Sequence, residues 1–287
     1  MNAIEIRNVT KRYPDFSLEN LNLRLPSGCI LGLIGENGAG KSTTIKLILN
    51  LIRRDSGEIF VMGKEIQNGF DSVREDIGVV LDEAYFPESI TARQVNAVMK
   101  RTYKKWDERE YSALIRRFSL PEDKPFKNFS RGMKMKLAIA VALSHHAKLL
   151  ILDEATSGLD PIVRDEIVDL FYEFTRKEDH SILISSHILS DLEKLCDYVA
   201  FLHRGKLLFC EEKDRLSERF LTVSGTKAQL ESLDKQAICG VRETDYGTQA
   251  LIDMEKLTNG RLPGNCRTQQ PTLEEIIIFL AKGGNSL

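Results

Sequence analysis

The stretch of sequence that decides the fold reads ILGLIGENGAGKST and runs from Ile30 to Thr43. It fits the pattern G-x-x-x-x-G-K-[S/T] from Gly35 onward, with an apolar run before the pattern and an amphipathic run, residues 44–51, after it. Strand, glycine loop and helix form the order in which this pattern binds phosphate. Glycines let backbone N–H groups converge on an anion, and the helix that begins near Lys41 directs its positive end at the same point. We therefore expect a phosphate-binding loop here rather than a flexible glycine turn.

Two side chains at the end of this loop carry predicted chemistry. Lys41 is expected to neutralise the β- and γ-phosphates of a nucleotide, and the Ser42 hydroxyl is expected to ligate Mg²⁺. The loop residues expected to bind the nucleotide are Gly35, Asn37, Gly38, Ala39, Gly40, Lys41, Ser42 and Thr43.

The bulk composition narrows the classes of function. The 287 residues include 40 Lys plus Arg against 42 Asp plus Glu, a formal net charge of −2. Proteins that bind a polynucleotide usually show a basic excess, so we expect no nucleic-acid partner. Five scattered cysteines without CxxC spacing favour a reducing cytosol over a disulfide framework or a zinc site. The sequence shows no signal peptide and no apolar stretch of the roughly 20 residues that cross a bilayer, so any membrane role would need a partner.

Apolar runs and helical patterns succeed one another along most of the chain. Strands are expected at residues 2–9, 18–25 and 58–62 around the phosphate loop, and an inserted helical lobe at about residues 84–148. Apolar runs and helices then alternate, which favours a buried parallel sheet covered by helices. The expected segments are strands at residues 149–152 and 181–184 and helices at residues 133–146, 163–176 and 188–195.

The pattern changes after a predicted hairpin at residues 198–202 and 206–210. Beyond about residue 211 the segments are shorter and less periodic, with strand-like runs at residues 219–223, 237–241 and 249–252 and a helix at residues 273–281. We expect an α/β protein with a large domain at residues 1–210 and a small α/β accessory domain at residues 211–287.

A second candidate anion site precedes the helix expected at residues 133–146. Ser130 is placed to cap that helix, and Gly132 admits close approach of the backbone. Taken alone, such a start is often an ordinary helix cap, and that alternative stays open.

Two carboxylates follow the apolar run at residues 149–152. Asp153 and Glu154 would lie at the carboxyl edge of a central strand, where parallel sheets bind their ligands. Asp153 could reach Mg²⁺ directly or through water, and Glu154 could polarise the water that attacks the γ-phosphorus. The alternative is a strand followed by a solvated acidic turn.

In this order the motifs resemble those of the nucleotide-binding subunit of an ATP-binding cassette (ABC) transporter, over residues 1 to about 210. The glycine loop resembles the Walker A motif, residues 129–133 the family signature, and residues 149–154 the Walker B strand with its catalytic glutamate. This resemblance implies a P-loop NTPase fold with a RecA-like parallel sheet core, an antiparallel β subdomain and a helical signature lobe.

Three further residues enter through the resemblance. Asp160, at the end of residues 157–160, resembles the aspartate of the D-loop, His187 the switch histidine, and Tyr13 the aromatic residue that stacks on adenine. Each also has a structural alternative. Tyr13 could be a core or turn aromatic, His187 a structural histidine, and Asp160, before Pro161, ordinary turn chemistry.

The resemblance also implies partners. In this family the signature of one subunit closes on the ATP held by the Walker A loop of another, so Ser130 and Gly132 would act in trans on a second, identical or different, ABC subunit. A separate transmembrane permease subunit would carry the cargo. The chain would then be cytoplasmic and peripheral, held at the inner face of the cell membrane by the permease.

Three positions depart from the family pattern. As we align it, Asp82 stands where the family usually has a glutamine that meets Mg²⁺ and relays to the membrane subunit. A carboxylate can still ligate Mg²⁺, but it adds negative charge beside Asp153, Glu154 and the triphosphate. We hypothesise a retained metal or water role with altered coupling. In the signature, Arg131 and Met133 stand where Gly and Gln are usual.

We therefore predict an ATPase that powers a membrane transporter with ATP and Mg²⁺. Residues 130–134 and the end segment at residues 271–275 resemble those of bacterial exporters of antibiotics, lantibiotics and membrane-active peptides, including phenol-soluble modulin exporters. The alternative is a soluble ABC ATPase that acts on ribosomes or DNA. Such proteins usually carry two cassettes or a long coiled coil, and neither is recognisable here.

Overall fold

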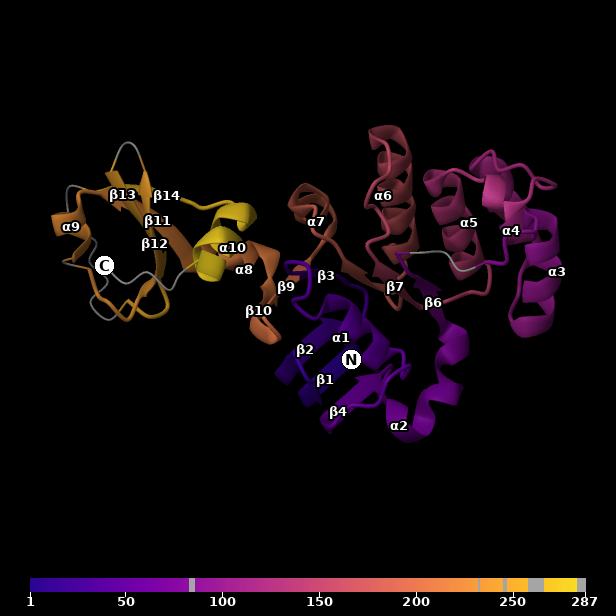
Figure 1. The fold of residues 1–287 in the computed structure, drawn as a ribbon, viewed down its shortest axis with the longest axis horizontal. Helices are drawn as coiled ribbons and strands as arrows, with labels where there is room; N and C mark the ends of the chain where they lie inside the picture. Colours follow the sequence, from indigo (N-terminus) through magenta and orange to yellow (C-terminus); the bar gives the residue numbers. More distant parts are fainter. Residues whose placement is uncertain (83–85, 232, 245–246, 258–265, 283–287) are drawn as a thin grey trace. The chain divides into compact units, whose positions relative to one another are not determined.

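The fold was analysed in a computed structural model, which describes residues 1–82, 86–231, 233–244, 247–257 and 266–282. Two compact units make up the chain, Met1–Cys210 and Glu211–Leu287, and Figure 1 labels their helices and strands. No helix among the described residues has both the length and the apolar character needed to cross a bilayer.

The first unit contains two sheets. Its strands are β1 (Asn2–Arg12), β2 (Ser17–Pro26), β3 (Ile30–Ile34), β4 (Ser56–Val61), β5 (Lys64–Glu65), β6 (Ile77–Val80), β7 (Leu149–Asp153), β8 (Ser181–Ser185), β9 (Tyr198–His203) and β10 (Lys206–Glu212). Its helices are α1 (Lys41–Ile48), α2 (Ile66–Gly69), α3 (Ala92–Thr102), α4 (Glu108–Arg117), α5 (Arg131–Leu143), α6 (Pro161–Thr175) and α7 (Leu189–Leu195), with short 3₁₀ turns at Phe70–Ser72, Arg74–Asp76 and Phe126–Asn128.

The larger sheet of this unit confirms the predicted parallel core. Among the described residues its strand order is β10-β9-β3-β8-β7-β6, and the neighbours from β9 to β6 run parallel. Every residue of β3, β7 and β8 is buried. This explains why these strands read as continuous apolar runs rather than as alternating patterns. All three end at one edge, which brings the phosphate loop after β3 beside the carboxylates at the end of β7.

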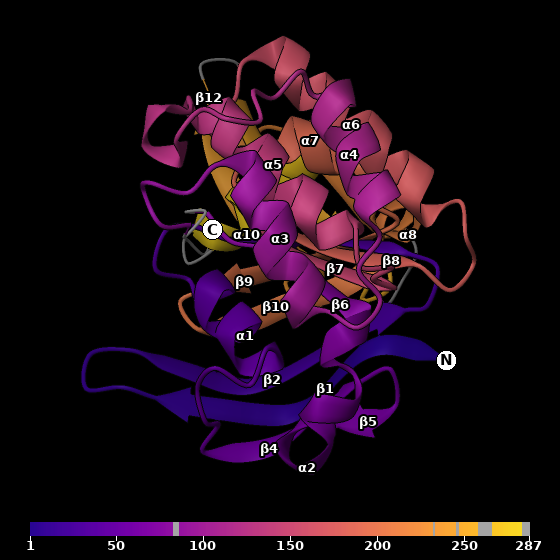
Figure 2. The ribbon, with the colours of Figure 1, turned by 90° about the vertical axis from the view of Figure 1, so that its right-hand side faces the viewer.

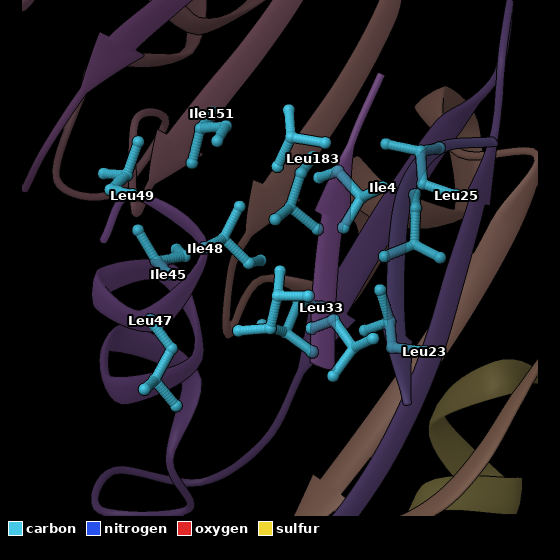
Figure 3. Close-up of a cluster of buried hydrophobic side chains, with 14 of the residues drawn as sticks. Ile4, Leu23, Leu25, Leu33, Ile45, Leu47, Ile48, Leu49, Ile151 and Leu183 are labelled. Atoms are coloured by element: carbon cyan, nitrogen blue, oxygen red, sulfur yellow. The ribbon is translucent and has the colours of Figure 1, made fainter. Parts of the chain in front are cut away.

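The smaller sheet is antiparallel, with the order β2-β1-β4-β5 among the described residues. In Figure 2 this sheet lies at the bottom, the helices α3, α4 and α5 at the top, and the strands of the parallel sheet between them. Figure 3 shows the core that joins the two sheets: Ile45 and Ile48 of α1 lie in one cluster with Leu33 of β3 and Leu23 of β2. The helix that follows the phosphate loop is therefore anchored by buried side chains.

Side chains cap the helices of the lobe above the parallel sheet. Thr91 and Gln94 form a capping box at α3, Asp107 caps α4, and Ser130 caps α5. The cap at Ser130 starts α5 at Arg131, two residues earlier than the sequence pattern predicts, because the apolar periodicity begins only after the first helical turn. The predicted start of the lobe, at about residue 84, lies outside the described residues.

One strand of the parallel sheet was not anticipated from the sequence. No strand was expected at residues 77–80, but in the structure they form β6, which pairs in parallel with β7. Gly78 allows this position, since a Cβ there would lie 2.6 Å from the carbonyl oxygen of Ala142 in α5. Asp82 consequently follows a strand of the parallel sheet, at the same edge as Asp153.

The second unit is a smaller α/β structure. It consists of α8 (Lys213–Arg219), β11 (Phe220–Gly225), α9 (Lys227–Glu231), β12 (Ile238–Thr244), β13 (Gly247–Asp253), β14 (Arg267–Gln269) and α10 (Leu273–Lys282). The described strands pair in antiparallel fashion in the order β12-β13-β11-β14. Val223, Leu230 and Ile252 belong to one apolar cluster of this unit, and Leu273, Ile276 and Phe279 are the buried residues of α10.

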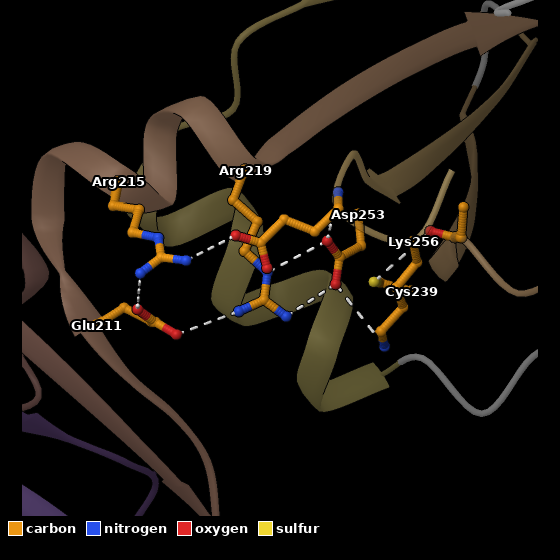
Figure 4. A network of polar contacts seen from close by, with 8 residues as sticks. Glu211, Arg215, Arg219, Cys239, Asp253 and Lys256 are labelled. Carbon is orange, nitrogen blue, oxygen red and sulfur yellow. Dashed lines mark hydrogen bonds and ion pairs between the residues drawn. The ribbon is translucent and has the colours of Figure 1, made fainter. Parts of the chain in front are cut away.

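An ion-pair network closes one end of this sheet. Arg219 donates to both oxygens of the buried Asp253, at 3.2 and 2.8 Å, and its third nitrogen lies 3.4 Å from Glu211 (Figure 4). Burial opposes ionisation of Asp253, but the hydrogen bonds and charge of Arg219 outweigh it and lower the pKa of that carboxyl. The pair therefore ties the end of α8 to the end of β13.

Candidate functional site

The phosphate loop wraps around the ammonium group of Lys41. Lys41 is 6% exposed, and its Nζ donates to the carbonyl oxygens of Gly35, at 2.7 Å, and Glu36, at 3.4 Å. Gly40 has φ 113°, a conformation that favours glycine, and a Cβ there would meet Leu18 and Phe16 at 3.0 and 3.1 Å. The loop therefore needs glycine both for its backbone turn and for its close packing at the start of α1.

A cleft of about 690 Å³ opens over this loop. This volume lies within the range of small-molecule sites. The cleft brings together residues from the phosphate loop and from the carboxyl ends of β6, β7 and β8. Its described lining consists of Asp15, Phe16, Glu36, Asn37, Gly38, Gly40, Lys41, Ser42, Thr43, Asp82, Arg131, Glu154, Ser157 and His187.

The two carboxylates at the end of β7 differ in position. Asp153 is 7% exposed and accepts a short hydrogen bond from the Ser185 hydroxyl, its partner across the parallel register of β7 and β8. Glu154 leaves the strand in the left-handed region, with φ 54°, and its N–H bonds to both the carbonyl and the hydroxyl oxygen of Ser185, at 3.1 Å each. Ser185 therefore fixes the backbone turn that sends Glu154 into the cleft while Asp153 stays beneath it.

Glu154 connects the phosphate loop with the histidine after β8. Its Oε1 lies 3.6 Å from Lys41 Nζ, and its Oε2 lies 2.7 Å from His187 Nδ1. The side chain of Glu154 is 15% exposed and that of His187 is 54% exposed. A carboxylate held between a buried cation and an accessible imidazole can position a water molecule and accept its proton. The structure thus brings together Lys41, Glu154 and His187, which are distant in the sequence.

Several predicted site residues lie outside the described lining of this cleft. Ser130 caps α5, with its hydroxyl accepting from Met133 N–H at 3.2 Å, and Asp160 caps α6, accepting from Val163 N–H at 3.0 Å. The contact of Ser130 is that of an ordinary helix cap, the alternative given for it, whereas Asp160 caps a helix instead of stabilising a turn. The other predicted residues outside the lining are Tyr13, Gly35, Ala39, Gly132 and Asp153.

The aromatic residue that lines the cleft is Phe16, which sequence reasoning missed. Tyr13, the predicted adenine-stacking residue, is 43% exposed and lies beside it, with ring centroids 6.5 Å apart. The backbone N–H of Tyr13 donates to the carbonyl of Phe16 at 2.7 Å, so the two belong to one turn between β1 and β2. A second aromatic residue three positions after Tyr13 was the available signal. Asp15, Glu36 and Ser157 are further lining residues that carried no signal of their own.

The donor set fits Mg²⁺ bound together with nucleotide phosphates. The described residues contain no group of three or more His, Cys, Asp or Glu side chains placed to bind a metal. Mg²⁺ keeps several waters and needs only one or two protein oxygens when phosphates supply the rest. Ser42 and Asp82 line the cleft, whereas Asp153 is buried at the end of β7, outside the described lining.

Comparison with known proteins gives consistent results. A family model described as ABC transporter matches residues 18–157. Bacitracin transport ATP-binding protein BcrA of Bacillus licheniformis is 38% identical over 220 residues, which cover 75% of this chain and 72% of that protein. Lantibiotic transport ATP-binding protein SrtF of Streptococcus pyogenes is 37% identical over 214 residues, which cover 74% of this chain and 91% of that protein.

Solved structures show the same fold. The structure of an ATP-binding subunit of an ABC transporter matches with a TM-score of 0.69 at 29% identity, covering 75% of this chain and 92% of that one. The predicted fold class, a P-loop NTPase with a parallel core and an antiparallel sheet, is confirmed by this likeness and by the sheet topology.

Proposed function

The chain belongs to the ABC transporter family, and we propose that it is the subunit whose ATP hydrolysis drives export of a peptide antibiotic or a related peptide through a separate membrane subunit. It is an ATP-binding protein and an ATPase by family. The observation that supports a working hydrolytic site is the contact of Glu154 with both Lys41 and His187 in a cleft lined by the phosphate loop.

We assign chemical tasks to the predicted residues in and around this cleft. Lys41 neutralises the β- and γ-phosphates, Glu154 orients the attacking water and takes its proton, and His187 holds Glu154 and contacts the γ-phosphate. Tyr13 and Phe16 contact the adenine base of the nucleotide. The loop residues that bind its phosphates are Gly35, Asn37, Gly38, Ala39, Gly40, Ser42 and Thr43. Mg²⁺ supplies charge neutralisation of the phosphates, and Ser42, Asp153 and Asp82 are the residues that would hold it.

The site is completed by a second ABC subunit, identical or different. The supporting observation is that Ser130 and Gly132 lie outside the described cleft lining, at a helix start where Ser130 is exposed. A helix N-terminus with free access can meet the phosphates of ATP bound to another subunit. Asp160, which follows the exposed Gly158, would contact that same subunit. ATP then favours the closed dimer and ADP the open one, a population shift driven by differential affinity.

We infer that the nucleotide-binding domain comprises residues 1–210 and that residues 211–287 form an accessory domain. The substrate class rests on the relatives, which are named as transport proteins for bacitracin and for a lantibiotic. These relatives give no support to the alternative, an ABC ATPase that works without a membrane partner. The proposed location is the inner face of the cell membrane, through the permease.

The test of the site is Glu154→Gln. This variant keeps the shape of the side chain but removes the base, so ATP binding should persist while steady-state hydrolysis falls by roughly 10²-fold or more. The closed dimer should then accumulate with ATP and be detected by size-exclusion chromatography. Glu110→Gln, an exposed change on α4, serves as the matched control. Undiminished hydrolysis by Glu154→Gln would exclude Glu154 as the base.

The test of the transporter role is co-purification from membranes extracted with mild detergent. A membrane protein should accompany the tagged chain and change its ATPase rate. A chain that hydrolyses ATP at full rate and associates with ribosomes or DNA instead would favour the alternative.

A further inference from the structure

Arg131 contacts two other segments of the first unit at the edge of the cleft. Its Nη2 lies 3.1 Å from Asp82 Oδ1, at the end of β6, and both side chains are 54% exposed. Its guanidinium also covers Gly158, where a Cβ would come within 2.7 Å of Nη1 and 3.0 Å of Cζ. Arg131 itself is the first residue of α5. The start of α5 is therefore linked to the end of the parallel sheet by an ion pair.

The ion pair between Arg131 and Asp82 changes the charge that a nucleotide would meet in the cleft. Among the described lining residues, Lys41 and Arg131 carry the fixed positive charges, against Asp15, Glu36, Asp82 and Glu154. Lys41 is already in contact with Glu154 at 3.6 Å. Arg131 is therefore the group that offsets the carboxylate at position 82. An unneutralised Asp82 would repel the triphosphate and attract a metal ion.

We propose that Arg131 and Asp82 form one unit that sets the metal requirement of the ATP site: Arg131 neutralises Asp82 until Mg²⁺ enters with ATP, and then releases the carboxylate to the metal. Arg131 is a positioning residue in this scheme, since it acts through Asp82. The inference rests on the proposed function of the cleft and names a regulation of that site. It also explains why two departures from the family pattern occur in one chain, because each compensates the charge of the other.

The geometry suits an exchangeable contact. Half-exposed ion pairs are screened by water and contribute little net stability, so a divalent cation beside a triphosphate can replace the guanidinium as the partner of Asp82. Because Gly158 has no Cβ, the guanidinium can lie against its backbone. The ion pair between Arg131 and Asp82 therefore contributes little net stability and can be exchanged for a metal contact.

The experiment measures two bindings separately in full-length protein at low ionic strength. A fluorescent ATP analogue in EDTA reports metal-free nucleotide affinity, and the electron paramagnetic resonance signal of free Mn²⁺, used in place of Mg²⁺, reports metal affinity with ATP present. The variants are Arg131→Ala, Asp82→Asn, their combination, and Arg131→Lys, which restores the charge. Thermal unfolding checks that each variant is folded.

The two single variants should move the two affinities in opposite directions. Arg131→Ala leaves Asp82 unneutralised, so metal-free ATP should bind more weakly and Mn²⁺ more tightly, each by roughly threefold to tenfold. Asp82→Asn should bind metal-free ATP more tightly and Mn²⁺ more weakly by similar factors. The double variant should return metal-free ATP affinity to near the wild-type value, while Mn²⁺ affinity stays low because the carboxylate is gone. Arg131→Lys should resemble the wild type.

The matched control is Arg117→Ala. Arg117 of α4 pairs with Glu173 of α6 at 2.7 Å, an ion pair that, like the Asp82–Arg131 pair, links the helical lobe to the parallel core, but outside the described cleft lining. Its loss should leave both affinities unchanged. The proposal is overturned if the Arg131 and Asp82 variants match this control, if both shift the affinities in the same direction, or if the double variant regains Mn²⁺ affinity. A wild-type chain that binds no ATP would instead refute the proposed function.

Discussion

The helices α1 and α5 both begin at a predicted anion site, but the two helix starts differ in exposure. The start of α1 is enclosed: Lys41 is 6% exposed and contacts Glu154 of the same chain. The start of α5 is open, with Ser130 exposed and outside the described cleft lining. At the start of α1 the contacting carboxylate belongs to the same chain, whereas the start of α5 exposes Ser130, which we propose meets a nucleotide bound by a second subunit. The predictions that follow test this division.

The largest effect is expected at the enclosed start. Lys41→Ala removes the buried cation that the loop carbonyls surround, so ATP affinity should fall by at least about 100-fold, and hydrolysis with it. Lys46→Ala removes an exposed lysine from the last turn of the same helix and should leave ATP binding unchanged. Equilibrium binding of a fluorescent ATP analogue measures both. Equal affinity in the two variants would contradict the role given to Lys41.

At the exposed start of α5, Ser130→Asp should lower the rate of ATP hydrolysis but leave ATP affinity nearly unchanged. Aspartate still caps α5, so the helix stays stable, but its charge repels a phosphate that approaches from a second subunit. ATP binding to the chain itself should change by less than about threefold, while hydrolysis falls by about tenfold or more. Asp107→Ala, which removes the cap of α4 in the same lobe, controls for helix stability. Loss of ATP binding by Ser130→Asp would show that Ser130, like Arg131, acts on the nucleotide of its own chain.

A smaller effect, on stability, is expected at Gly158, which lies beside the guanidinium of Arg131 at the start of α5. Gly158→Ala adds a Cβ at φ 66° against the guanidinium, which should lower the free energy of unfolding by about 1–2 kcal/mol. Gly69→Ala is the matched control, because its φ is −125° and its nearest neighbour would lie at 3.5 Å. Urea unfolding of both variants measures the difference, and equal midpoints would show that Arg131 accommodates the added Cβ.

The smallest effect concerns the far end of α5, which is buried rather than open. Burial lowers the pKa of His145, whose Nδ1 lies 3.1 Å from the carbonyl of Glu75 and whose ring stacks on Tyr103. Because the folded state favours the neutral ring, the unfolded chain binds more protons below pH about 6.5. The free energy of unfolding should therefore decrease as the pH falls below that value. In His145→Gln the free energy of unfolding should depend less on pH. If its pH dependence is unchanged, other groups are responsible for it.

Much of the first unit could be predicted because its information is local. The buried strands β3, β7 and β8 are short apolar runs, and the glycine loop and the Asp153-Glu154 pair each lie directly after one of them. The carboxyl ends of parallel strands meet at one edge, so the approach of Lys41 and Glu154 follows from topology. The strand β6 escaped prediction because it is four residues long and contains Gly78, which weakens a strand pattern.

The second unit was predictable only as a set of short segments. Arg219 and Asp253 are 34 positions apart, and neither lies in a motif that marks it as the partner of the other. Desolvation makes a buried carboxylate costly unless a cation meets it, so the fold, not the local sequence, selects this pair.

From the sequence alone a phosphate site at residues 35–43 could be predicted, since glycines, a lysine and a helix start form a recognisable phosphate-binding pattern. Only the tertiary structure decided that Phe16 lines the cleft, that Glu154 contacts both Lys41 and His187, and that Arg131 pairs with Asp82. The physical reason is that a phosphate-binding loop is made by neighbouring residues through backbone geometry. Charge compensation depends instead on distances between side chains from separate strands and helices, which exist only after the sheet has formed.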